Sequence, residues 1–149
     1  MLLRRGRAMI TVFIMLDVAL YSKWLDPVSA ADISKRTGLA QRGIEPTLQV
    51  LARASFLERM RGRWGGYRLG RPRRQIFVSD ILAAMVSDAS ESDDRLTIDL
   101  FTQVIEPTWQ QLDDKMLHQL QGLSLEDLTR KAESAGLHHP SRKPITFSI

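Results

Sequence analysis

The sequence predicts a mainly α-helical protein with one small β-hairpin and a long C-terminal helix. Apolar residues recur every three or four positions in several segments, which is the spacing of helices with one buried face. Near the middle of the chain, two short β-prone runs flank a glycine-rich stretch, a pattern typical of a hairpin. A further apolar stripe at helical spacing occupies much of the C-terminal half.

Two helices are expected at the start of the chain. The first spans residues 7–21 and is apolar on most sides, so we expect it in the core. After a connector over residues 23–27, Ser29 and Asp32 are spaced as a variant of the capping box, whose side chains accept hydrogen bonds from free amides at a helix start. This second helix is expected to end near Gly38, because glycine readily adopts left-handed backbone geometry.

A third helix is expected to end at Ala54, and a proline limits where it can begin. Proline is tolerated in the first turn of a helix, where its missing amide would lack a partner anyway. Pro46 therefore predicts that the regular helix begins late, around residues 42–44. Two short helices joined by a turn that contains glycine form a candidate helix-turn-helix.

A β-hairpin is expected directly after this third helix. Its strands are predicted at residues 56–60 and 67–69. The tip between them, residues 61–66, reads Arg-Gly-Arg-Trp-Gly-Gly and is both basic and rich in glycine. A helix-turn-helix followed by such a hairpin is the arrangement of a winged helix-turn-helix.

A long amphipathic helix is the main feature expected in the C-terminal half. Its stripe begins at Leu96, and Pro107 predicts a kink or a break within it. The stripe either packs inside the molecule or forms the seam of a dimer, and the two uses are compatible. The expected dimer contacts are Phe101, Ile105, Trp109, Leu112, Met116 and Leu120.

Polar segments surround this long helix. Residues 87–95 are acidic and are expected to form a loop. A last helix is predicted after Ser124, which has Asp127 three residues on as a second variant of the capping box. The final residues, 137–149, are expected to be a flexible tail.

Charge is distributed unevenly along the chain. The formal net charge is +4, but residues 1–75 carry 15 Lys and Arg against 5 Asp and Glu, whereas residues 76–149 carry 6 against 12. This asymmetry indicates a basic half that faces a polyanion and an acidic half kept away from it. The alternative is chance clustering of charges on solvated faces, and the charge counts alone do not separate the two.

Composition also excludes several classes of protein. Because the chain has no cysteine, disulfides, thiolate metal sites and cysteine nucleophiles are excluded, and a reducing cytoplasm is the expected location. The longest apolar run, residues 8–20, is too short to cross a bilayer and contains Asp17, so we expect neither a membrane anchor nor a signal peptide. The three histidines and the remaining residues form no Ser/His/Asp set, phosphate loop or metal-spaced histidine pair. We therefore expect no enzyme and no cofactor or metal.

Several unlike features point to double-stranded DNA as the partner. A recognition helix places polar residues of its first turns against base edges in the major groove, where arginine, glutamine and glutamate can pair with guanine, adenine and cytosine. Arginines of a wing can reach a narrow minor groove, and arginines at the N-terminus suit phosphate contacts. The candidate DNA-binding residues are Arg4, Arg5, Arg7, Gln41, Arg42, Glu45, Thr47, Gln49, Arg61, Gly62, Arg63, Trp64, Gly65 and Gly66. The alternatives are that the helix residues are ordinary exposed residues and that Trp64 packs under the hairpin.

The order of these motifs resembles the IscR/NsrR-type (Rrf-two) family of bacterial winged-helix regulators. The resemblance is carried by residues 28–34, by Gly38-Leu39 and by residues 44–51, which read Ile-Glu-Pro-Thr-Leu-Gln-Val-Leu. Its most specific part is the wing, where residues 61–69 are similar to the family signature Arg-Gly-x-x-Gly-Gly-Tyr-x-Leu. The resemblance covers about residues 2–135 and is strongest in the first half.

The resemblance implies a homodimer whose long helices cross and whose two wings straddle a palindromic DNA site. By position, Glu45 and Arg61 match the family's recognition-helix and wing contacts with DNA, while Trp64 replaces a residue that is commonly small. Many members of the family bind an iron–sulphur cluster through three cysteines in the loop before the long helix. This chain has no cysteine, so cluster sensing by that route is excluded.

Four segments are therefore expected: a winged helix-turn-helix DNA-binding domain (1–86), an acidic loop (87–95), a dimerisation helix with a C-terminal helix (96–136) and the tail (137–149). The predicted function is a sequence-specific transcription regulator, most often a repressor in such families, that binds a palindromic operator as a homodimer. Its effector is not identified by the sequence. The alternative is a protein-interaction module that uses the winged helix as a scaffold.

Overall fold

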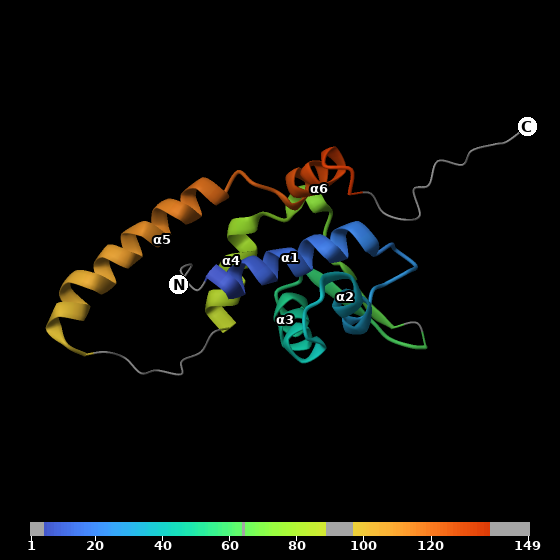
Figure 1. The fold of residues 1–149 in the computed structure, drawn as a ribbon, viewed down its shortest axis with the longest axis horizontal. Coiled ribbons are helices and arrows are strands. Elements are labelled where there is room, and N and C mark those ends of the chain that lie inside the picture. Colours follow the sequence, from blue (N-terminus) through green and yellow to red (C-terminus); the bar gives the residue numbers. More distant parts are fainter. Residues whose placement is uncertain (1–4, 64, 89–96, 138–149) are drawn as a thin grey trace, which may run out of the picture.

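The computed structural model describes residues 5–63, 65–88 and 97–137 of the chain. Helices dominate this part, and one two-stranded antiparallel sheet forms the wing (Figure 1). The elements are α1 (Arg5–Tyr21), α2 (Ala30–Thr37), α3 (Gln41–Arg53), β1 (Leu57–Met60), β2 (Gly66–Leu69), the 3₁₀ turn η1 (Arg73–Gln75), α4 (Val78–Asp88), the π-helical turn η2 (Phe101–Ile105), α5 (Glu106–Leu120) and α6 (Leu125–Ser134). This order confirms the predicted fold class of helices with one small hairpin.

The helix α1 is the centre of the core. It contacts α2, α4, α6 and β2, and Figure 1 shows α2 and α3 on one side of it and α6 on the other. Every α-helix except α5 contributes a fully buried apolar side chain to the main cluster, and so does Ile76 just before α4. The largest of these side chains are Ile14, Met15, Val18, Ile33, Ile44, Leu48, Leu51, Ile76, Ile81 and Leu125.

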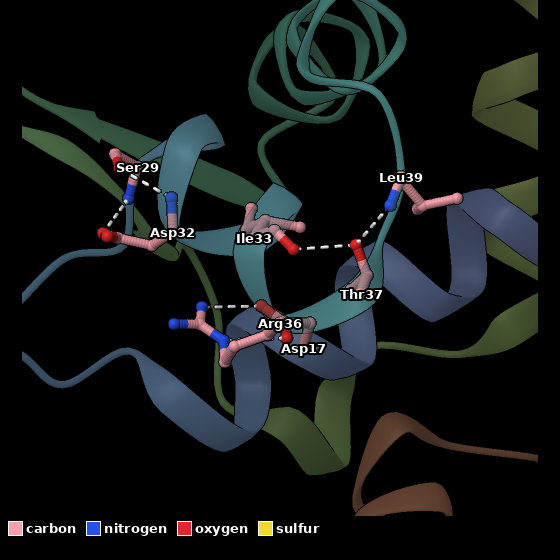
Figure 2. Close-up of polar contacts among 7 residues, drawn as sticks. All are labelled: Asp17, Ser29, Asp32, Ile33, Arg36, Thr37 and Leu39. Carbon is pink, nitrogen blue, oxygen red and sulfur yellow. Dashed lines mark hydrogen bonds and ion pairs between the residues drawn. The ribbon is translucent and has the colours of Figure 1, made fainter.

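The helix α2 is fixed by polar contacts at both ends (Figure 2). At its start, the Asp32 amide donates to the Ser29 hydroxyl (3.1 Å) and the Ser29 amide donates to the Asp32 carboxylate (3.0 Å), which confirms the predicted capping box. At its end, Gly38 has a φ of 76°, the left-handed geometry expected there. The Arg36 guanidinium donates to both carboxylate oxygens of the buried Asp17 in α1, at 2.8 and 3.0 Å, a contact that the sequence did not predict.

A short turn leads from α2 into α3. The Thr37 hydroxyl donates to a carbonyl of the preceding turn (2.7 Å) and accepts from the Leu39 amide (3.2 Å), as Figure 2 shows. α3 then begins at Gln41, so the prediction of a later start was wrong and Pro46 lies inside the helix. Proline at this point removes only one helical hydrogen bond, to the carbonyl of the exposed Arg42, and the buried face of α3 outweighs that loss.

The wing is an antiparallel hairpin that also pairs with the connector before α2. Its register runs from Leu57 opposite Leu69 to Met60 opposite Gly66. Val28 exchanges two backbone hydrogen bonds with Tyr67, at 2.9 and 2.7 Å, on the free side of β2. Tyr67 and Leu69 of β2 are partly buried and pack against the core.

The helix α5 is different because none of its residues is buried. Figure 1 shows it extending away from the other helices, with its C-terminal end towards α4. At Pro107, where the sequence predicted a kink or a break, the chain has a wider turn, η2, in which the Glu106 amide donates to the carbonyl of Phe101, five residues back. This π-helical turn precedes the proline, and the chain continues as a helix through it.

The helix α6 returns to the first part of the chain. It packs against α1 and η1, and Leu125 at its start is fully buried in the main core. Ser124 and Asp127 form the second predicted capping box, with hydrogen bonds of 2.9 and 3.1 Å. Among the residues described, no helix is long and apolar enough to cross a membrane.

Candidate nucleic-acid interface

An exposed row of polar side chains runs along α3. Gln41, Glu45 and Gln49 follow one another at intervals of four residues, so they share one face of the helix. The Gln41 amide group donates to the Glu45 carboxylate across one turn, at 3.4 Å. The opposite face carries Ile44 and Leu48, which are buried in the core. The amphipathic pattern of α3 thus decides which polar side chains face outwards.

A hollow of about 600 Å³ lies between α3, the wing and the start of α2. It brings Glu45 and Gln49 of α3 together with residues of the hairpin that are at least ten positions away in the chain. The residues that line it are Ser29, Ala30, Glu45, Gln49, Arg59, Met60, Arg61, Gly62, Gly65, Gly66 and Tyr67. Carboxylate, amide and guanidinium groups line this hollow, so its surface can both donate hydrogen bonds to a ligand and accept hydrogen bonds from it.

The glycines of the wing are required by its geometry. Gly62 has a φ of 112°, which side chains other than hydrogen rarely allow, and its carbonyl accepts from the Gly65 amide at 3.0 Å. A Cβ on Gly65 would lie 2.9 Å from the Met60 carbonyl oxygen, and one on Gly66 would lie 2.6 Å from that of Val28. The tip can close, and lie against the connector, only because these positions have no side chain.

The base of the wing is held by Arg68. This buried guanidinium forms an ion pair with Glu58 on the neighbouring strand, at 3.0 and 3.1 Å, and donates to the Trp24 carbonyl at 2.7 Å. It also lies over the Trp24 ring, 3.8 Å from the ring centre. Arg68 therefore has a structural role in fixing the hairpin to the connector after α1, which sequence reasoning missed.

The structure places the predicted site residues in different surroundings. Glu45, Gln49, Arg61, Gly62, Gly65 and Gly66 line the hollow, with Gln41 joined to them through Glu45. Arg42 and Arg63 are also exposed and lie close in sequence to the residues of the hollow, and Arg7 is exposed on α1. The half-buried Thr47 directs its hydroxyl to the Gly43 carbonyl, at 3.3 Å. Arg4, Trp64 and the side chain of Arg5 lie outside the described residues.

Sequence reasoning also missed Arg59, which lines the hollow from β1. A signal for it was present, because side chains alternate along a strand and Arg59 stands two positions before Arg61. The predicted site included the arginines of the tip, but the alternating pattern of side chains was not followed back along the strand to Arg59.

Ionised groups anchor α2 beneath the hollow. The Ser29 amide, which donates to the Asp32 carboxylate, lowers the pKa of Asp32 below its usual value despite the opposing effect of burial. The hydrogen bond to Asp17 raises the pKa of Arg36 above its usual range, so this guanidinium stays charged at any physiological pH. Within the described residues, no group of three or more His, Asp or Glu side chains lies close enough to bind a metal ion.

Comparison with protein families identifies the chain. Residues 4–131 match the Rrf2 family model, whose description is iron-dependent transcriptional regulator. The chain belongs to the Rrf2 family. Together with the winged helix-turn-helix, this membership makes the protein a DNA-binding transcription regulator and not an enzyme.

Known relatives agree with this assignment. The HTH-type transcriptional regulator IscR of Vibrio atlanticus (strain LGP32) is 33% identical over 132 residues, which cover 87% of this chain and 75% of that protein. Among solved structures, IscR of T. potens is similar with a TM-score of 0.66 and 29% identity, covering 86% of each chain. CymR of B. subtilis, at 22% identity and a TM-score of 0.62 over 83% of this chain and 93% of its own, shares the fold.

The Rrf2 description includes iron, and this member does not fit a thiolate-bound cluster. Thiolates hold iron–sulphur clusters, and the whole chain contains no cysteine. The acidic loop expected over residues 87–95 lies largely outside the described residues. This Rrf2 protein therefore has no thiolate ligands for an iron–sulphur cluster.

Proposed function

We propose that this protein binds a palindromic operator as a homodimer, in the cytoplasm, and represses transcription. The observation that carries the proposal is the hollow between α3 and the wing, where Glu45 and Gln49 stand beside Arg61. These three side chains come from two elements with different roles in DNA docking. Their convergence on one outward surface is what a regulator that reads two adjacent grooves requires.

The proposed docking places α3 in the major groove and the wing in the neighbouring minor groove. The exposed row of Gln41, Glu45 and Gln49 then faces base edges, where glutamine suits adenine and glutamate accepts from the amino group of cytosine. Arg61, exposed at the end of β1, reaches towards the minor groove. Gly62, Gly65 and Gly66 let the backbone of the wing approach the DNA closely.

The homodimer is supported by apolar surface that no part of the described chain covers. On α5, Leu112 and Met116 are 46% and 43% exposed, and on α1 Met9 and Phe13 are 69% and 46% exposed. An open groove of about 570 Å³ runs between α1 and the C-terminal part of α5, from Met116 onwards, and is lined by apolar side chains of α1, α4, α5 and α6. Contiguous apolar surface of this kind marks an interaction site. A second copy would cover it and would supply the second half of a palindrome.

The segments proposed for these roles are residues 1–86 for DNA binding and 96–136 for dimerisation and the C-terminal helix. Phe101, Ile105, Trp109, Leu112 and Met116 are the proposed seam on α5 and the turn before it. Leu120 differs from them, because it packs against the second core cluster, around Val78, Leu82 and Met85. It is the point where the seam joins the body of the same protomer.

Capture of genomic DNA tests this function directly. The purified protein is mixed with sheared DNA of its source organism at moderate salt, and the retained fragments are sequenced. Enrichment of fragments that share a palindrome is the expected result. Retention of no DNA by a folded protein would contradict the proposal and would favour the protein-interaction alternative.

Arg61→Ala tests the wing in the same assay. Removing the guanidinium should weaken binding to the recovered palindrome by about tenfold, or roughly 1–2 kcal/mol. The thermal unfolding midpoint should not change, because Arg61 is exposed. Arg130→Ala, an exposed arginine of α6 on the other side of α1, is the matched control. Equal affinity of the Arg61→Ala and Arg130→Ala proteins would contradict the wing contact.

A further inference from the structure

The side chain of Arg59 is placed by the alternation of β1. Leu57, two residues earlier, is buried in the core beneath the hairpin. Glu58 lies on the other face, where it pairs with Arg68. Arg59 therefore lies on the same face of β1 as Leu57, and this face is turned towards α3. Beyond the end of the core, Arg59 on this face lines the hollow.

The charges that line the hollow suggest a specific role for Arg59. Arg59 and Arg61 are the two basic residues that line it, and Glu45 is the acidic one. A carboxylate on the recognition helix repels the phosphates of any DNA that docks there. A guanidinium on the facing strand offsets that repulsion and offers hydrogen-bond donors at the same place.

The proposed docking leads one DNA strand through the hollow. If α3 occupies the major groove and the wing occupies the adjacent minor groove, the phosphodiester chain that separates the two grooves passes between α3 and the wing. We propose that Arg59 binds a phosphate of this chain, as a contact that the family signature at the wing tip does not include. The inference rests on the proposed function and adds a positioning contact to it.

Arg59 and Arg61 then have different roles. Arg61 stands at the tip and reaches a groove, so its loss should affect specific binding most. Arg59 stands between the grooves and meets the backbone, which carries no sequence information. Its loss should weaken specific and non-specific binding by the same factor.

A salt titration tests this assignment on the full-length protein. The probes are the palindromic fragment recovered from genomic DNA and an unrelated duplex of equal length. In Arg59→Gln, the plot of log affinity against log salt should become less steep by about 0.9, which corresponds to the loss of one phosphate contact. Binding should weaken roughly eightfold at about 0.1 M salt on both probes. Arg59→Lys keeps the charge and should restore most of the slope.

Arg130→Gln removes the same charge from a distant, exposed position and should leave the slope unchanged. Thermal unfolding of each variant confirms that the fold is intact. A wild-type slope in the Arg59→Gln protein, or a loss confined to the palindromic probe, would overturn the assignment of Arg59 to the backbone. If the unaltered protein binds neither probe at any salt concentration, the proposed function fails and the Arg59 contact fails with it.

Discussion

The helices α3 and α5 both carry apolar side chains at helical spacing, and the structure uses them in opposite ways. α3 buries Ile44, Leu48, Val50 and Leu51 against other elements of the same chain. α5 buries none of its residues, although Leu112 and Met116 continue its stripe. The comparison teaches that periodicity identifies a face that needs a partner, and does not say whether that partner is the same chain or a second copy.

Proline sharpens the same comparison. Pro46 stands inside α3, and the helix keeps its regular form around it because buried side chains hold both turns in place. Pro107 stands in the first turn of α5, after a π-helical turn that widens the backbone. The packed helix absorbs a proline through its contacts, whereas the unpacked helix changes its backbone instead.

The largest expected effect is on the packed helix. Leu48→Ala removes a side chain with no exposed surface and should lower the free energy of unfolding by about 3–4 kcal/mol. Leu112→Ala removes the same atoms from a half-exposed position on α5 and is the matched control. Chemical denaturation at low protein concentration, where the monomer dominates, measures both. A similar loss in the two variants would mean that α5 is packed within the protomer after all.

The second effect concerns association of two copies. Leu112→Glu places a charge in the proposed seam and should weaken the dimer by about thirtyfold, or roughly 2 kcal/mol, because an unpaired charge is costly to bury. The secondary structure should persist, since Leu112 is 46% exposed in the protomer. Sedimentation velocity across a concentration series measures the dissociation constant. Gln111→Glu, at the exposed neighbouring position, controls for the added charge, and an unchanged dimer in both variants would exclude this seam.

Sequence patterns predicted the local parts of this structure well and the distant contacts poorly. The capping boxes and Gly38 were predicted because their partners lie within a few residues. The Arg36–Asp17 pair joins residues 19 positions apart, and the bond from Arg68 to the Trp24 carbonyl joins residues 44 apart. Spacing carries no information about such pairs.

The candidate site shows the same limit. The polar row on α3 and the arginines of the tip followed from local patterns, and the structure brings most of them to one hollow. Arg59 could have been found by extending the strand alternation, since that rule is local. That Ser29 and Ala30 at the start of α2 also line the hollow could not be predicted from local patterns. These residues lie beside the wing because Val28 pairs with Tyr67, which only the folded structure shows.

The smallest effect is expected at the helix caps, where α2, which precedes the packed α3, can be compared with α6, which follows α5. Ser29→Ala and Ser124→Ala remove equivalent hydroxyls from α2 and α6, and each should lower the free energy of unfolding by about 1 kcal/mol at neutral pH. Both helices pack on α1, so equal losses are expected even though α6 follows the unpacked α5. A much smaller loss at Ser124 would mean that α6 is held with α5 and not with the core.

Acid titration gives the carboxylate side of the same caps. The amides of Ser29 and Ser124 lower the folded-state pKa of Asp32 and Asp127 below the ordinary 3.8, so their contribution to stability is present above that pH. It is lost as the pH falls through the lowered folded-state values, where both carboxyls become neutral. The difference in unfolding midpoint between the wild type and Asp32→Asn should therefore be present at neutral pH and close in strong acid. A difference that persists unchanged below those values would show that the carboxylate charge is not what stabilises the cap.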